Sequence, residues 1–153
     1  MMDIDIYKSQ FGNLHVKITN CKKAQNKAIM LISVMELIRC KYITSNSIFI
    51  DDTIVEAFNA NWNLYVGENP PTAWTPFWHM KDEPFWHFSP LNSVDDIEKL
   101  VAPGETASVG KMKSVIEYAY LDEDLFEIMK TTNGRTSLFE VLKENYLPYK
   151  IIL

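Results

Sequence analysis

Two of the three histidines in this chain lie in a repeated tetrapeptide. Pro-Phe-Trp-His occupies residues 76–79 and again residues 84–87, with Asp82 and Glu83 between the copies. Imidazole and carboxylate groups are common zinc ligands. A structural zinc ion takes four ligands and a catalytic one three, however, and the third histidine, His15, is distant in the sequence. The number of ligands is therefore too small, and we predict neither a metal nor another cofactor.

The residues that could act as nucleophiles lack the partners that catalysis needs. Cys21 and Cys40 are the two cysteines of the chain, and no His/Asp arrangement accompanies either of them. The chain contains no nucleophile-elbow motif and no glycine-rich phosphate loop. Two cysteines without a CxxC spacing also make no disulfide framework, which favours a cytoplasmic protein with reduced thiols. An enzyme is therefore the least supported of the function classes.

Basic residues are concentrated in the first third of the chain, although the net charge of all 153 residues is −5. Residues 1–50 carry seven Lys and Arg against three Asp and Glu, whereas residues 51–153 carry eight against seventeen. No acidic residue lies between positions 11 and 35, a stretch that contains Lys17, Lys22, Lys23 and Lys27. A basic region on an acidic body suits a surface that faces an anion. A solvated lysine-rich loop would produce the same pattern.

Length and hydropathy indicate one domain, residues 1–153, that has no membrane partner. A chain of this size can bury a core of its own, and no linker divides it. No run approaches the roughly 18 apolar residues of a membrane span. The first residues, MMDIDIYKSQFG, also lack the basic and apolar segments of a signal peptide.

Periodicity and capping residues predict a mostly helical α+β domain with a small sheet. Apolar residues at spacings of three and four predict a long helix from Ala24 to about Cys40. Asp51 or Asp52 can cap a second helix that runs to about Tyr65. Shorter helices are expected over residues 4–11, 93–101 and 123–129, a last one from Thr136 or Ser137 to about 146, and strands over 46–50 and 115–121.

The repeated tetrapeptide itself predicts an aromatic β-hairpin. Two short aromatic runs, residues 77–80 and 85–88, flank a polar segment that can turn. Side chains alternate along a strand, so Phe77 and Trp78 would face opposite sides of the sheet. The two histidines would face each other if the loop has three residues, and would not if it has four. The simplest interpretation is a hairpin that packs in the core and whose histidines have no special function.

Four motifs in a fixed order resemble a known family. They are NKAIMLISVMELI (26–38), DDTIVEAFNANWNLYV (51–66), PFWHMKDEPFWHF (76–88) and AYLDEDLFEIMK with RTSLFEVLKENYLP (119–148). The set resembles the sulfur-recognition domain that precedes the HNH nuclease domain in predicted bacterial restriction endonucleases. The resemblance spans nearly the whole chain. No H-N-H constellation is present, so the resemblance implies no DNA cleavage by this chain alone.

The resemblance implies binding of DNA whose backbone carries a phosphorothioate. Sulfur in place of a non-bridging oxygen keeps the negative charge but is larger, softer and less hydrated. Recognition then needs cations for the charge and an apolar pocket for the sulfur. The resemblance assigns the pocket to Thr75, Pro76, Phe77 and Trp78. It assigns contacts with the DNA backbone to Asn26, Lys27, Arg135 and Thr136, to which the basic stretch adds Lys22 and Lys23.

The chain departs from the family pattern at four positions. Asn26 and Ala28 replace the usual His and Pro around the lysine, Thr75 replaces a tyrosine, and Pro84 replaces the turn glycine. A protein-interaction or structural module of the same fold without DNA binding is the main alternative. A nuclease domain or subunit supplied elsewhere is a further expected partner. Lys27→Glu is expected to weaken DNA binding without unfolding the domain.

Overall fold

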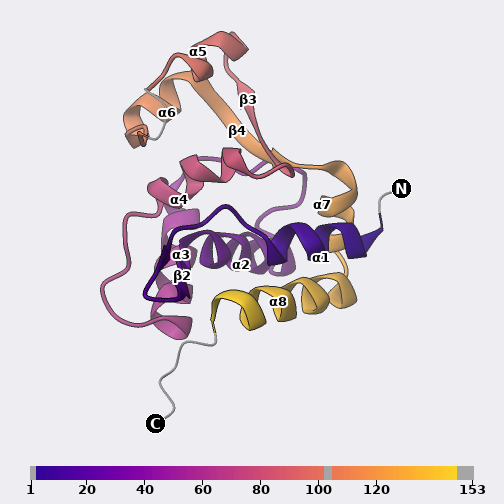
Figure 1. The fold of residues 1–153 in the computed structure, drawn as a ribbon. Helices are drawn as coiled ribbons and strands as arrows, with labels where there is room; N and C mark the ends of the chain where they lie inside the picture. Colours follow the sequence, from indigo (N-terminus) through magenta and orange to yellow (C-terminus); the bar gives the residue numbers. More distant parts are fainter. Residues whose placement is uncertain (1–2, 102–104, 148–153) are drawn as a thin grey trace.

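In the computed structural model, the chain is built around one central helix, α2 (Asn26–Arg39). The structure describes residues 3–101 and 105–147. Eleven of the fourteen residues of α2 are buried, as expected for a helix that is apolar on nearly every side. The predicted long helix is therefore confirmed. The helices that pack on it are α3 (Asp52–Tyr65), α4 (Trp74–His79) and α8 (Thr132–Tyr146) (Figure 1).

Side-chain caps determine where most of the other helices begin. Asp51 Oδ1 accepts a hydrogen bond from the Ile54 amide at 3.2 Å, which confirms the predicted start of α3. Asp3 and Ser93 cap their helices in the same way. The other helices are α1 (Ile4–Gly12), α5 (Val94–Glu98), α6 (Val109–Val115) and α7 (Glu123–Met129), and α6 is not among the helices expected from the sequence.

The last helix, α8, begins earlier than predicted. Its cap is Thr131, whose Oγ1 accepts a hydrogen bond from the Gly134 amide at 3.0 Å, so neither Thr136 nor Ser137 starts the helix. Gly134 favours a break when only the sequence is considered. Here it is required inside the first turn, because a Cβ at this position would overlap the carbonyl oxygen of Ile128. Close packing of α8 on α7 therefore explains the glycine.

In the part of the chain that the structure describes, two small antiparallel sheets complete the α+β fold, which confirms the predicted class. The first joins β1 (Ile18–Thr19) to β2 (Lys22–Lys23), and the second joins β3 (Trp86–Pro90) to β4 (Ile116–Leu121). The expected strand over residues 46–50 is reduced to one bridge, between Ile48 and Ala119 at the edge of β4. Among the described residues, no helix is long and apolar enough to cross a membrane.

The predicted aromatic hairpin is wrong. The first Pro-Phe-Trp-His forms the end of α4, which continues into a short 3-10 helix, η1 (Met80–Asp82), and only the second copy enters a strand. β3 pairs with β4 rather than with residues 77–80. The reason lies in burial: Phe77 and Trp78 are both buried. Adjacent residues of a strand face opposite sides, whereas the face that a helix packs against α2 is wide enough for both.

The two copies instead pack against each other, α4 on the inward face of β3. The Phe77 ring lies 5.4 Å from that of Trp86 in an edge-to-face arrangement and 5.9 Å from that of Phe88. Trp78 stacks on Phe88 at 5.6 Å. β3 and β4 then extend away from the helices and carry α5 and α6 at their far end (Figure 1). The last residues of the sequence, YLPYKIIL (146–153), also suggest an extended tail, and most of them lie outside the described residues.

Candidate nucleic-acid interface

A pocket of about 420 Å³ lies between the first turn of α2 and helix α4. Four of the ten residues predicted to bind DNA or sulfur line it, namely Asn26, Lys27, Thr75 and Pro76. They come from segments about fifty residues apart, and the packing of α4 on α2 brings them together. Other lining residues were not among the predicted ones: His15, Lys17, His79, Asp82 and Thr106.

One wall of the pocket is apolar. Pro76 is buried in the first turn of α4, a position where a helix tolerates proline because the missing amide proton has no partner to lose. Its ring still borders the pocket together with Val16 and Ala24, and these three residues form the apolar wall. Thr75, half-buried, contributes the edge beside Pro76. The pocket therefore presents hydrocarbon surface next to the polar groups at the start of α2.

The other two residues assigned to the sulfur pocket do not line it. Phe77 is completely buried and Trp78 is 2% exposed, both on the core side of α4. The Trp78 Nε1–H donates a hydrogen bond to the Glu105 carbonyl oxygen at 3.0 Å, and Lys81 Nζ lies 5.2 Å from the centre of the indole. Phe77 and Trp78 thus hold α4 in place behind Pro76.

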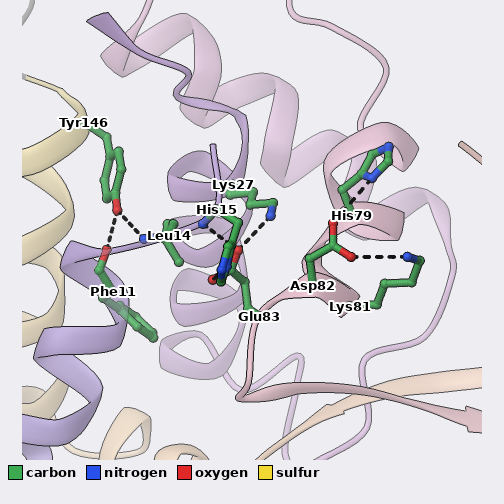
Figure 2. A network of polar contacts seen from close by, with 9 residues as sticks. All are labelled: Phe11, Leu14, His15, Lys27, His79, Lys81, Asp82, Glu83 and Tyr146. Atoms are coloured by element: carbon green, nitrogen blue, oxygen red, sulfur yellow. Dashed lines mark hydrogen bonds and ion pairs between the residues drawn. The ribbon is translucent and has the colours of Figure 1, made fainter. Parts of the chain in front are cut away.

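Lys27 is not a solvated lysine, which corrects that part of the charge-based interpretation. It is 6% exposed, and its Nζ lies 2.7 Å from Oε2 of Glu83, which is 3% exposed (Figure 2). The same carboxylate accepts a hydrogen bond from the His15 amide at 2.9 Å, and its Oε1 lies 3.3 Å from His15 Nδ1. Lys27→Glu would bury two carboxylates side by side, so this variant is expected to unfold the domain rather than only to weaken DNA binding.

His79 borders the pocket next to Thr106 and Asp82. Its Nε2 lies 2.7 Å from Thr106 Oγ1, and its Nδ1 lies 3.9 Å from a carboxylate oxygen of Asp82. Burial lowers the pKa of His79 below its ordinary value of 6.5, and the nearby lysines act in the same direction, although Asp82 opposes them. The imidazole can therefore accept or donate a hydrogen bond near neutral pH without adding charge.

Lys22 and Lys23 lie on β2, next to the pocket in the chain but not in its lining. Lys22 is exposed. Lys23 is half-buried, with its Nζ 5.5 Å from the centre of the Tyr146 ring. The hydroxyl of Tyr146 donates to the Phe11 carbonyl oxygen at 2.7 Å and accepts from the Leu14 amide at 2.9 Å (Figure 2). These contacts hold the segment that carries His15 against α8.

Arg135 and Thr136 are separated from the other predicted residues. They border a different hollow of about 250 Å³, beside Glu36 and Arg39 in the C-terminal half of α2. A helix of this length spans roughly 20 Å, so this hollow and the first turn of α2 lie at opposite ends. Arg135 Nη1 also donates to the Met129 carbonyl oxygen at 3.0 Å, at the C-terminal end of α7. Its guanidinium therefore contributes to the junction of α7 and α8.

The histidines of the two tetrapeptides have different partners. His87 Nε2 lies 2.6 Å from Asp122 Oδ1, and that carboxylate also accepts a hydrogen bond from the Tyr7 hydroxyl at 3.1 Å through Oδ2. His79 instead meets Thr106. Within residues 3–101 and 105–147, no group of three or more His, Cys, Asp or Glu side chains is placed to hold a metal ion.

The sequence contained partial signals for the residues that were missed. Lys17 belongs to the stretch without acidic residues, and His79 and Glu83 belong to the motif that suggested the family. Nothing local connects His15 or Thr106 to them, because 68 residues separate His15 from Glu83 and 27 separate His79 from Thr106.

Solved structures of two other proteins share this fold. The sulfur binding domain of SprMcrA complexed with phosphorothioated DNA matches with a TM-score of 0.70 and 14% identity, over 98% of this chain and 89% of that chain. The sulfur binding domain and SRA domain of ScoMcrA, also complexed with phosphorothioated DNA, matches with a TM-score of 0.66 and 15% identity. That match covers 92% of this chain and 42% of the other. No protein-family model and no curated protein matches the sequence.

Proposed function

We propose that this chain is a DNA-binding module that recognises phosphorothioate-modified DNA and has no nuclease activity of its own. One observation carries the proposal: the first turn of α2 and the Thr75–Pro76 edge of α4 form one pocket. The fold that builds this pocket is shared with two sulfur binding domains complexed with phosphorothioated DNA.

The start of α2 supplies the attraction for a backbone phosphate. Gln25, the N-cap residue of this fourteen-residue helix, makes no capping hydrogen bond with its side chain, which leaves the first amide groups for a ligand at the N-terminus. The helix dipole favours an anion there. Asn26 offers an amide donor, and the exposed Lys17 offers a charge at the rim. Lys22 and Lys23 would contact the neighbouring stretch of DNA backbone.

The apolar wall supplies the preference for sulfur. Sulfur is larger and more weakly hydrated than oxygen, so it gains contact with Pro76, Val16 and Ala24 and gives up fewer strong hydrogen bonds with water. A phosphate oxygen at the same place would lose its hydrogen bonds with water, and contact with the apolar wall would not replace them. In this proposal Phe77 and Trp78 support the wall from behind, and Arg135 and Thr136 take no part in the sulfur site.

The biological setting follows from the family that the motifs resemble. We place the module in the bacterial cytoplasm, in a restriction system where a nuclease domain or subunit is supplied elsewhere. The module would then select the modified DNA, and the nuclease would cut it.

A gel-shift assay with matched duplexes tests the proposal. One duplex carries a single phosphorothioate and the other has the same sequence with ordinary phosphates. We expect tighter binding of the modified duplex at moderate salt. Equal binding of the two duplexes would overturn sulfur recognition. Equal binding with a strong salt dependence would leave a DNA-binding protein that reads only the charge of the backbone.

A protein-interaction module is the second candidate. The observation that favours it is the ion pair of Lys27 with Glu83, which removes a cation from the basic region. The seventeen acidic residues after position 50 also oppose DNA wherever they face it. Absence of binding to both duplexes in the same gel-shift assay would support this candidate.

A further inference from the structure

Three segments that border the pocket meet at the carboxylate of Glu83. This residue follows η1, and its side chain is 1% exposed. It holds the Lys27 ammonium from the first turn of α2 and the His15 amide from the segment before β1 (Figure 2). Either charge would be costly to bury alone, and the contact between Lys27 and Glu83 offsets that cost for both.

The pair leaves the pocket with little net charge. Lys27 lines the pocket, but Glu83 lies 2.7 Å from its ammonium and cancels it. The other charged lining residues are Lys17 and Asp82, one of each sign. Burial lowers the pKa of His79 and so favours its neutral imidazole. An anion that enters the pocket therefore meets helix amides and hydrocarbon, with the Lys17 ammonium at the rim, while the Lys27 ammonium is held by Glu83.

We propose that Glu83 determines the preference of the pocket for sulfur over oxygen, by holding the Lys27 ammonium away from the ligand. This inference rests on the proposed function. An ordinary phosphodiester and a phosphorothioate carry the same charge, so attraction to charge alone cannot separate them. A free ammonium would even favour oxygen, which accepts a stronger charge-assisted hydrogen bond than sulfur does. With Lys27 neutralised, contact with the apolar wall decides which atom binds better.

A charge series separates this role from a purely structural one. Glu83→Gln frees the Lys27 ammonium and leaves the side chain almost the same size. The double variant Lys27→Met/Glu83→Gln removes both charges and restores a neutral pocket. Replacing both members of a buried ion pair is often tolerated by the fold. A structural role would weaken DNA binding in both variants, whereas the proposal predicts opposite outcomes for them.

The test measures the affinity of the wild type and the two variants for the matched duplexes, with folding checked by circular dichroism. For Glu83→Gln we expect affinity for the ordinary duplex to rise about tenfold and the preference for the modified duplex to fall several-fold. For the double variant we expect the wild-type preference, within about twofold. If Glu83→Gln does not fold, the double variant still tests the proposal. Loss of its sulfur preference would show that recognition needs the Lys27 charge, which contradicts the proposed role of Glu83.

The outcomes also distinguish this inference from the proposed function. A wild-type protein that binds both duplexes equally, or neither, overturns the proposed function and this inference with it. A wild-type protein that prefers the modified duplex, with a folded Glu83→Gln variant of unchanged affinities, overturns only the role of Glu83.

Discussion

The same four residues, Pro-Phe-Trp-His, adopt two different structures in this molecule. The copy at 76–79 lies in a helix, and the copy at 84–87 passes through a turn into a strand. In both copies the Phe and the Trp are buried and the His is partly exposed. Which side chains are buried therefore depends on residue type and is the same in both copies. The backbone conformation differs, because it depends on the element that each copy packs against.

The neighbours of each copy explain the difference. The first copy packs on α2, where a helix can bury consecutive residues. The second pairs with β4, and its residues alternate: Trp86 points inward, and His87 points outward toward Tyr120 and Asp122. A tetrapeptide is too short to carry either conformation by itself, since helix nucleation and strand pairing both depend on contacts outside it.

The residue before each proline extends the comparison to the candidate site. Thr75, before the first copy, borders the pocket directly. Glu83, before the second, does not line the pocket but holds Lys27 and His15, which do. The second copy is thus joined to the site through its preceding residue.

The largest effect is expected on stability, when the buried phenylalanine of either copy is removed. Phe77→Ala and Phe85→Ala should each lower the free energy of unfolding by about 3–5 kcal/mol, because both rings are fully buried. Urea unfolding measures the loss. Leu64→Ala, at a side chain that is 69% exposed, is the control and should change stability by less than about 0.5 kcal/mol. A loss below about 1 kcal/mol for either phenylalanine would show that its copy does not belong to the core.

A negative charge should distinguish the two copies by DNA affinity. Thr75→Glu places a carboxylate at the pocket and should weaken binding of a phosphorothioate duplex about tenfold by repulsion of the backbone. Ser89→Glu adds the same charge to β3, opposite Tyr118, and should leave affinity within about twofold. Fluorescence anisotropy at one salt concentration measures both. Equal weakening by the two variants would mean that the pocket is not the contact surface.

The two prolines should differ in sulfur preference. Pro76→Ala removes a ring that borders the pocket, so the preference for the modified duplex should fall by about threefold. Pro84→Ala changes an exposed turn residue. It should keep the preference and cost at most about 1 kcal/mol of stability, through the greater freedom of the unfolded chain. An unchanged preference in a folded Pro76→Ala variant would remove the proline ring from the sulfur site.

The smallest effect concerns the dependence of stability on pH. The pKa of His79 is lowered by burial, so the folded state favours the neutral imidazole. Its contribution to stability is complete above pH 6.5 and is lost as the pH falls below 6.5 through the lower pKa of the folded state. His79→Gln should therefore flatten the decline in melting temperature between pH 7 and 5. An imidazole pKa of 6.5 or higher in an NMR titration of the folded protein would contradict this cause.

The sequence was a good guide wherever a feature depends on residues close together in the chain. The cap at Asp51 joins residues three apart, and the apolar spacing of α2 is complete within one helix. The α+β class, the helices α1 and α7 and the strand β4 also followed from local patterns in the sequence. The order of the four motifs led to the same fold that the solved sulfur binding domains show.

Tertiary structure alone decided how the repeated tetrapeptide folds and which predicted residues share a site. It brought Asn26 and Lys27 to Thr75 and Pro76, and left Arg135 and Thr136 at the other end of α2. It also gave Lys27 a partner 56 residues away. Counting charges treats every lysine as a free cation. A buried ammonium, however, keeps its charge only beside an anion, and tertiary packing rather than sequence position determines which anion that is.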